Sequence, residues 1–170
     1  MKGTWAALLA VVLALSLQTT VVYETGGNRP VVDLVLVVVV YVALSAGPLA
    51  GLWTGTLAGL VQDALSGGIV GVGGLSKSLV GFLAGALARQ FIVVNPLPRF
   101  VVFVGGSLLH AACFLGLYQV IDPAAFRGVW ATAVSQAVVN GLIGVSAFQL
   151  VERGPEWWHR RRLRRASLRR

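Results

Sequence analysis

Three ionisable side chains stand inside strongly apolar stretches of the chain. Asp63 and Lys77 lie on either side of a glycine-rich turn, and His110 lies in the middle of a long apolar run. A carboxylate inside a membrane is costly unless it is paired or faces a polar cavity. We therefore predict that Asp63 and Lys77 form an ion pair that holds two helices together across the turn. The alternatives for Asp63 are a contact that fixes the turn, a contact with a partner or ligand, and proton chemistry.

Two amide side chains could join His110 in the apolar interior. Gln136 and Asn140 are four residues apart and share one face of a helix. We expect this polar stripe to meet His110 or Gln62, with His110 neutral and hydrogen-bonded across helices. Such interhelical bonds typically contribute about 0.6 to 2 kcal/mol each. A ligand or proton-relay role for His110 would need a carboxylate nearby, and its own helix has none.

Acid–base and metal chemistry have little material in this sequence. There are only six acidic residues, most of them at the ends of predicted helices, and general acid–base catalysis needs positioned titratable groups. The sequence contains neither a nucleophile elbow, nor a zinc-protease motif, nor a phosphate-binding loop. The single Cys113 excludes a disulfide framework and a thiolate metal site. We predict no catalytic activity, no metal and no cofactor.

Small residues recur at a fixed step in the segment that leads to Asp63. The row is Gly47, Gly51, Gly55, Gly59, Asp63 and Gly67. Glycine weakens a helix in water, but in lipid a row of glycine lets a neighbouring backbone approach closely. We predict that this row packs on another helix, with Gly81 and Gly85 as the internal mate. Packing on another protein is the alternative.

The elements that carry these residues are predicted to be membrane-spanning helices. The chain is 56% hydrophobic and 12% charged, and about 20 apolar residues cross the hydrocarbon core. We predict an all-α, polytopic membrane protein, a six-transmembrane-helix bundle in one domain over residues 1–152. The first span could instead be a signal peptide cut near Ala14-Leu15-Ser16, but we favour an uncleaved anchor. The predicted spans are 4–23, 31–46, 48–66, 76–94, 98–121 and 128–150.

Residues 153–170 form a predicted basic cytoplasmic tail, which holds eight of the fourteen lysines and arginines. With both termini in the cytoplasm, eleven basic residues lie inside and three outside, as the positive-inside rule requires. Tryptophan prefers the membrane interface, and each arginine near an anionic leaflet contributes roughly 1 kcal/mol. We expect the tail to bind anionic lipids rather than nucleic acid, with an acidic cytoplasmic partner as the alternative. The residues in question are Trp157, Trp158, Arg160, Arg161, Arg162, Arg164 and Arg165.

The motifs around the glycine row resemble the signature of the rod shape-determining protein MreD family. In that family a G-x-x-x-G-L-x-x-D-x-x-S/G-G helix runs into a glycine-rich turn and then into a V-G-Y/F-L-x-G helix. Lys77 departs from this pattern as a cation in the apolar lead-in to the predicted fourth helix. The resemblance covers nearly the whole chain. Its specific part lies in Gly51-Leu52-Trp53-Thr54-Gly55, in Gly59 to Gly68, in Gly71-Val72-Gly73-Gly74-Leu75 and in Leu79 to Gly85.

The resemblance implies a non-enzymatic scaffold in the inner membrane of a bacterium, within the cell-elongation machinery. Members of such a complex would include the direct partner MreC, the filament protein MreB and the peptidoglycan synthases. The family is also similar in architecture to the substrate-binding S-components of energy-coupling-factor vitamin transporters. A vitamin-binding S-component is therefore the alternative function.

Overall fold

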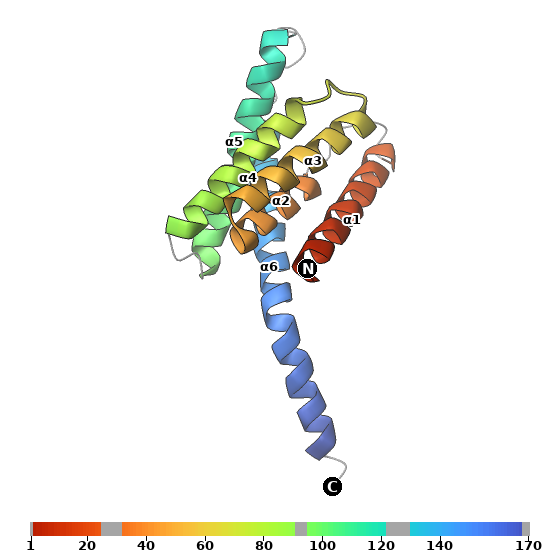
Figure 1. Cartoon of the computed structure of the whole chain (residues 1–170), viewed down its shortest axis with the longest axis vertical. Helices are drawn as coiled ribbons and strands as arrows, with labels where there is room; N and C mark the ends of the chain where they lie inside the picture. Colours follow the sequence, from red (N-terminus) through yellow and green to blue (C-terminus); the bar gives the residue numbers. More distant parts are fainter. Residues whose placement is uncertain (1, 25–31, 91–94, 122–129, 168–170) are drawn as a thin grey trace.

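The structure is a computed structural model that describes residues 2–24, 32–90, 95–121 and 130–167. These residues form six helices and contain no strand, so the predicted all-α fold is confirmed (Figure 1). The helices are α1 (Lys2–Glu24), α2 (Leu34–Ala46), α3 (Pro48–Ser66), α4 (Val72–Gln90), α5 (Pro96–Ile121) and α6 (Trp130–Ser167).

The helices differ in their ability to cross a membrane. Among the described residues, the stretches Pro96–Val120 and Thr132–Glu152 are long and apolar enough to span one. Ala7–Thr20 and Leu34–Ala46 are apolar but shorter. Membrane crossing by all six helices therefore stays a prediction, while α5 and α6 carry the length and composition that a span requires.

Several helix ends differ from the predicted ones, and three of these differences have a structural meaning. α2 begins at Leu34, because the Asp33 carboxylate caps it by accepting from the Leu36 N–H at 2.9 Å. α4 begins at Val72, four residues earlier than expected, because a carboxylate binds the N–H groups of its first turn. α6 continues without a break past residue 152 to Ser167. The predicted boundary between the membrane domain and the tail therefore does not coincide with the end of a helix.

α2 is the central element of the bundle. Seven of its thirteen residues are buried, and Val35, Val39 and Ala43 have no exposed surface. Its side chains join two apolar clusters, one completed by Phe103 and Phe148 and the other by Ala14, Leu15 and Ala58. A helix this apolar on all sides belongs in the interior of a bundle.

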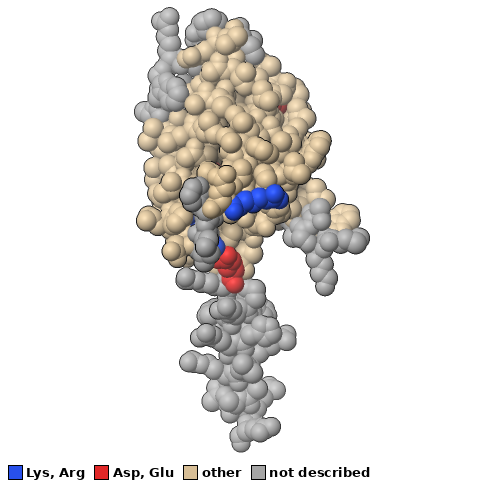
Figure 2. Space-filling model, turned by 60° about the vertical axis from the view of Figure 1, so that its left-hand side comes forward, with Lys and Arg blue, Asp and Glu red and all other residues tan. Residues whose placement is uncertain are grey.

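Many large apolar side chains are exposed, while several charged side chains are buried. Trp5, Leu9, Leu49 and Trp53 are each more than 60% exposed, whereas Lys77 is 3% exposed. Figure 2 shows one face that is almost free of charged side chains. Water-soluble surfaces do not carry continuous apolar area of this extent. The surface is therefore one that faces lipid or another apolar protein surface.

Both ends of the chain point to the same side of the bundle (Figure 1). The beginning of α1 and the C-terminal half of α6 lie toward that side, and α6 extends well beyond the other helices. An even number of membrane crossings would produce this arrangement.

Candidate functional site

The glycine row brings α3 against α4 along what we call the glycine seam, formed by Gly51, Gly55 and Gly59 with the facing backbone of α4. A Cβ atom on Gly55 would lie 2.6 Å from the carbonyl carbon of Lys77, and one on Gly59 would lie 2.5 Å from the Cα of Gly74. On Gly51 it would meet the backbone of Gly81 and the side chain of Ala43. Backbone lies on backbone at each point, so no side chain fits between the two helices.

The two ends of the row have different roles. Gly47 has a φ of 96° in the sharp turn between α2 and α3, and the backbone there contacts Gly85. Gly67 caps α3 in the left-handed conformation at φ 65°. A Cβ on Gly67 would have no described atom within 4 Å. The prediction that Gly67 packs on a helix is therefore wrong: this glycine ends the helix.

Asp63 fixes the turn between α3 and α4. Its Oδ2 accepts hydrogen bonds from the backbone N–H groups of Gly71, Gly73 and Gly74 at 2.9, 2.9 and 3.2 Å. The first N–H groups of a helix have no partner within the helix and carry partial positive charge. A buried carboxylate placed there satisfies them, and glycine at these positions leaves room for it. One of our alternatives for Asp63, the contact that fixes the turn, is thus the one that the structure contains.

The predicted Asp63–Lys77 ion pair is wrong, because each residue has another partner. The Lys77 ammonium lies 2.9 Å from Oδ2 of Asp33, with side-chain exposures of 3% and 7%. The carboxylate of Asp63 is already satisfied by hydrogen bonds from the backbone N–H groups of the turn. Lys77, one turn further along α4, points its side chain toward the start of α2 instead.

His110 on α5 completes what we call the polar cluster: Asp33, Lys77, His110, Asn140 and Ser107. Its Nε2 lies 3.3 Å from the Lys77 ammonium and 3.6 Å from Oδ2 of Asp33. The predicted helix of His110 contains no carboxylate. The bundle supplies one from α2.

Asn140 on α6 binds the start of α2 rather than His110 or Gln62. Its Oδ1 accepts the Asp33 N–H at 2.9 Å, and its amide donates to Ser107 on α5 at 3.1 Å. Gln18 on α1 accepts from the Leu34 N–H and donates to the Val32 carbonyl oxygen. Non-helical backbone at membrane depth is tolerated where protein groups satisfy it. The buried backbone at the beginning of α2 is satisfied in this way by side chains of two other helices, α1 and α6.

Sequence reasoning missed Asp33, the residue on which the polar cluster is centred. Asp33 fell within the predicted span 31–46 and was given no role. A signal was present, since an aspartate directly before a long apolar run is a typical helix N-cap. What the sequence could not supply is the depth of that cap. α2 has only 13 residues, about 20 Å at the usual rise, so its start lies inside the bundle.

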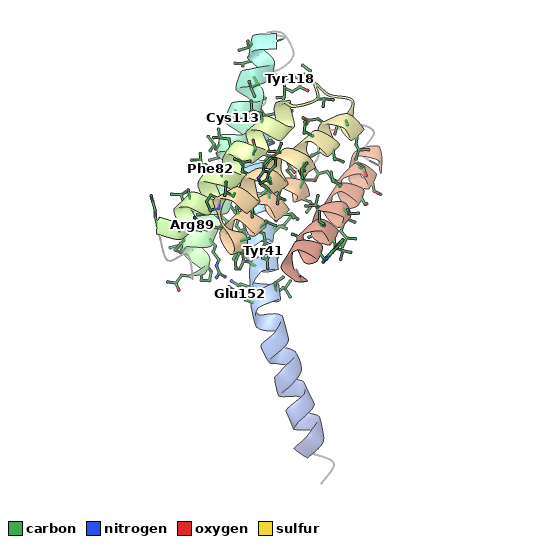
Figure 3. The ribbon with its side chains drawn as sticks, in the orientation of Figure 1. Tyr41, Phe82, Arg89, Cys113, Tyr118 and Glu152 are labelled. Atoms are coloured by element: carbon green, nitrogen blue, oxygen red, sulfur yellow. The ribbon has the colours of Figure 1, made fainter. Side chains whose placement is uncertain are left out.

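A second ion pair lies where α6 leaves the bundle. Arg99 at the start of α5 donates two hydrogen bonds to Glu152, at 2.6 and 2.8 Å, and lies over the Phe148 ring at 4.0 Å. Glu152 is labelled in Figure 3 at the lower end of the bundle. A bidentate arginine contact fixes orientation as well as distance, so the pair sets the direction in which α6 departs.

The tail side chains lie outside those that the structure describes. The backbone through Trp157, Trp158, Arg160, Arg161, Arg162, Arg164 and Arg165 is helical. Lipid binding by these residues stays a prediction.

Inward charges, an apolar exterior and helices fit to span a bilayer define a helical membrane protein. The described residues hold no group of three or more metal-ligating acids, histidines or cysteines. What this arrangement can do chemically is hold helices in place and offer shaped apolar faces.

Comparison with known families places the chain. The family model for rod shape-determining protein MreD matches residues 1–153, so the chain belongs to the MreD family and the resemblance seen in its motifs is confirmed. Membership implies a role in determining rod shape. No curated protein and no solved structure gives a significant match.

Proposed function

We propose that this protein is a non-enzymatic adaptor of the bacterial rod complex, which binds the membrane anchor of MreC and helps couple MreB filaments to the peptidoglycan synthases. The observation that carries the proposal is the family match over residues 1–153. The protein would work in the inner membrane, with six spans and both termini in the cytoplasm.

The surface of the bundle supports an adaptor role. Exposed apolar side chains lie on five of the six helices, among them Leu9 on α1, Trp53 on α3 and Phe82 on α4. A single-pass partner needs little more than such a face, because helix association in lipid depends on shape and close packing. The basic tail would add contact with anionic lipids.

Photo-crosslinking from single positions tests this proposal. A crosslinking amino acid is placed at one exposed site on each of five helices, in cells that also produce MreC. We expect MreC adducts from one contiguous face, and none from the fully buried Val39 of α2, which serves as the matched control. Absence of adducts from every exposed site would contradict direct binding of MreC. The exposed sites are Leu9, Trp53, Phe82, Val101 and Leu142.

The vitamin-binding alternative has a separate test. An S-component would bind a vitamin tightly as an isolated protein, and the likeness of architecture stays a prediction. We expect thermal unfolding of the purified chain in lipid nanodiscs to be unchanged by a panel of B vitamins. A stabilisation that saturates with one of them would support transport instead.

A further inference from the structure

The polar cluster has an electrical balance that depends on one proton. Asp33 contributes one negative charge and Lys77 one positive charge, and both are buried. With His110 neutral, the sum is zero. A buried pair of opposite charges can be accommodated, whereas an unpaired buried charge is strongly destabilising.

The contact of His110 with Lys77 favours one tautomer of the neutral ring. The Lys77 ammonium has donors and no acceptor, so the contact at 3.3 Å is a hydrogen bond when Nε2 of His110 accepts. We assign the ring proton to Nδ1 on this basis. That atom is buried and has no hydrogen-bond partner among the described residues. The neutral form is therefore held by one hydrogen bond from Lys77.

From this geometry we infer that Asp33, Lys77 and His110 form a proton-binding site that opens the bundle when it is occupied. A proton from water adds to Nε2 of His110 and removes the hydrogen bond that Lys77 donates there. Two cations then face one carboxylate, and the cluster has a net positive charge. The charge is relieved when α5 moves away from α2 and α4 and water reaches the ring.

Among the residues that the structure describes, the groups around His110 offer no other source of compensation. The charged ones are Asp33 at the start of α2 and Lys77 on α4. The uncharged Asn140 of α6 binds the Asp33 N–H and Ser107, and α5 itself contributes the Phe114 ring at 5.6 Å from His110. Asp63 on α3 is held by three N–H groups of the turn. None of these can neutralise a second cation.

Cys113 provides a natural reporter of this opening. It is the only cysteine in the sequence, is half-buried, and lies three residues after His110 on α5, where Figure 3 labels it. The full chain in lipid nanodiscs is treated with a water-soluble maleimide at a series of pH values. An exposed histidine titrates near pH 6.5, so opening should increase about tenfold at one pH unit below that value.

The control is His110→Gln, which keeps a polar side chain that never becomes charged. At low pH a smaller fraction of the Cys113 thiol is ionised, which slows labelling equally in both proteins. The ratio of their labelling rates therefore reports the opening of the bundle alone. We expect the ratio of wild-type to H110Q labelling rates to rise about tenfold between about pH 7.5 and about pH 5.5. A ratio that stays constant over this range would overturn the inference.

Lys77→Met gives a second test that survives failure of H110Q to fold. In K77M the carboxylate of Asp33 keeps one potential counter-ion, His110, so adding a proton neutralises the cluster. Acid should therefore stabilise K77M, raising its unfolding temperature, while it destabilises the wild type. Unfolding temperatures that fall with acid in both proteins would overturn the inference. In a purely structural cluster, the effect of acid on the unfolding temperature has no reason to change sign between the wild type and K77M.

This site goes beyond the adaptor function and does not rest on it. Labelling and unfolding are measured on the isolated protein. A protein that fails to bind MreC could therefore still open in acid, and a protein that does not open in acid could still bind MreC.

Discussion

The glycine seam and the polar cluster hold neighbouring parts of one bundle by opposite means. The seam joins α3 to α4 by backbone contact without any charge, at points such as Gly55 on the Lys77 carbonyl group. The polar cluster joins α2, α4 and α5 through buried charges that need one another. One depends on shape alone, and the other on electrical balance.

Lys77 links the two regions. Its backbone lies against Gly55 in the seam, and its ammonium lies in the cluster. The seam therefore fixes the position from which the side chain reaches Asp33. This order of dependence predicts that damage to the seam also disrupts the cluster, whereas a balanced change in the cluster leaves the seam intact.

Gly55→Leu should have the largest effect, loss of the folded bundle. Its Cβ alone would lie 2.6 Å from a backbone carbon of α4, and backbone of a packed helix cannot move aside as a flexible side chain can. Overpacking typically costs about 1 to 3 kcal/mol and occasionally more, and we expect this variant to exceed that range because the leucine side chain would meet backbone. Size-exclusion profiles and thermal unfolding in detergent measure the loss.

The matched control is Gly105→Leu on α5. A Cβ on Gly105 has no described atom within 4 Å, so the same substitution meets open space. We expect a wild-type profile. Equal behaviour of the two leucine variants would show that the seam is not tightly packed.

Asp33→Asn should have the next largest effect, because it leaves the Lys77 ammonium buried without its carboxylate. Breaking a buried ion pair typically costs about 3 to 5 kcal/mol. The double variant Asp33→Asn/Lys77→Met removes both charges and should recover most of that loss. Unfolding of all four proteins in the double-mutant cycle measures the coupling, and additive effects would show that the pair contributes nothing.

Asp63→Ala should cost less, about 1.5 to 3 kcal/mol, the usual range for hydrogen bonds to a charged group. Three N–H groups of the turn lose their acceptor. Water can replace the carboxylate at the part-buried Gly71 N–H, which reduces the cost. Hydrogen exchange should rise at the start of α4 and stay unchanged at Gly81. Ser66→Ala, an exposed change nearby, is the control, and equal exchange in both variants would contradict the capping role.

Arg99→Lys should have the smallest effect, about 1 kcal/mol or less, because Glu152 is half exposed and water screens the pair. Lysine keeps the charge but loses the two-point contact and the stacking on Phe148. The variant should therefore unfold nearly like the wild type while spin labels on α5 and α6 report a broader distance distribution. An unchanged distribution would show that Arg99 does not set the direction of α6.

Much of the fold could be predicted from the sequence. The apolar runs and their glycine and proline breaks define helix positions, and α3 was predicted with its observed bounds, Pro48–Ser66. Helix starts at Leu34 and Val72 were displaced because capping carboxylates, not apolar length, decide them. Local patterns locate helices, but tertiary contacts decide where they begin.

The candidate site was less predictable. The glycine spacing pointed to a packing face because its effect is local and geometric. The partner of Lys77 was missed because Asp33 is 44 positions away in the chain, and only the short length of α2 brings it to the same depth. Asp63 was available as a nearer partner, and the sequence does not reveal that turn N–H groups had already satisfied it.

Close backbone packing of α3 on α4 should be required for the role in rod shape that family membership implies. Rescue of rod shape tests this in rod-shaped bacterial cells depleted of their own MreD, with the wild type, Gly55→Leu and Gly105→Leu compared. We expect rods with the wild type and Gly105→Leu, and rounded cells with Gly55→Leu. Rods supported by Gly55→Leu present in the membrane at the wild-type amount would contradict it.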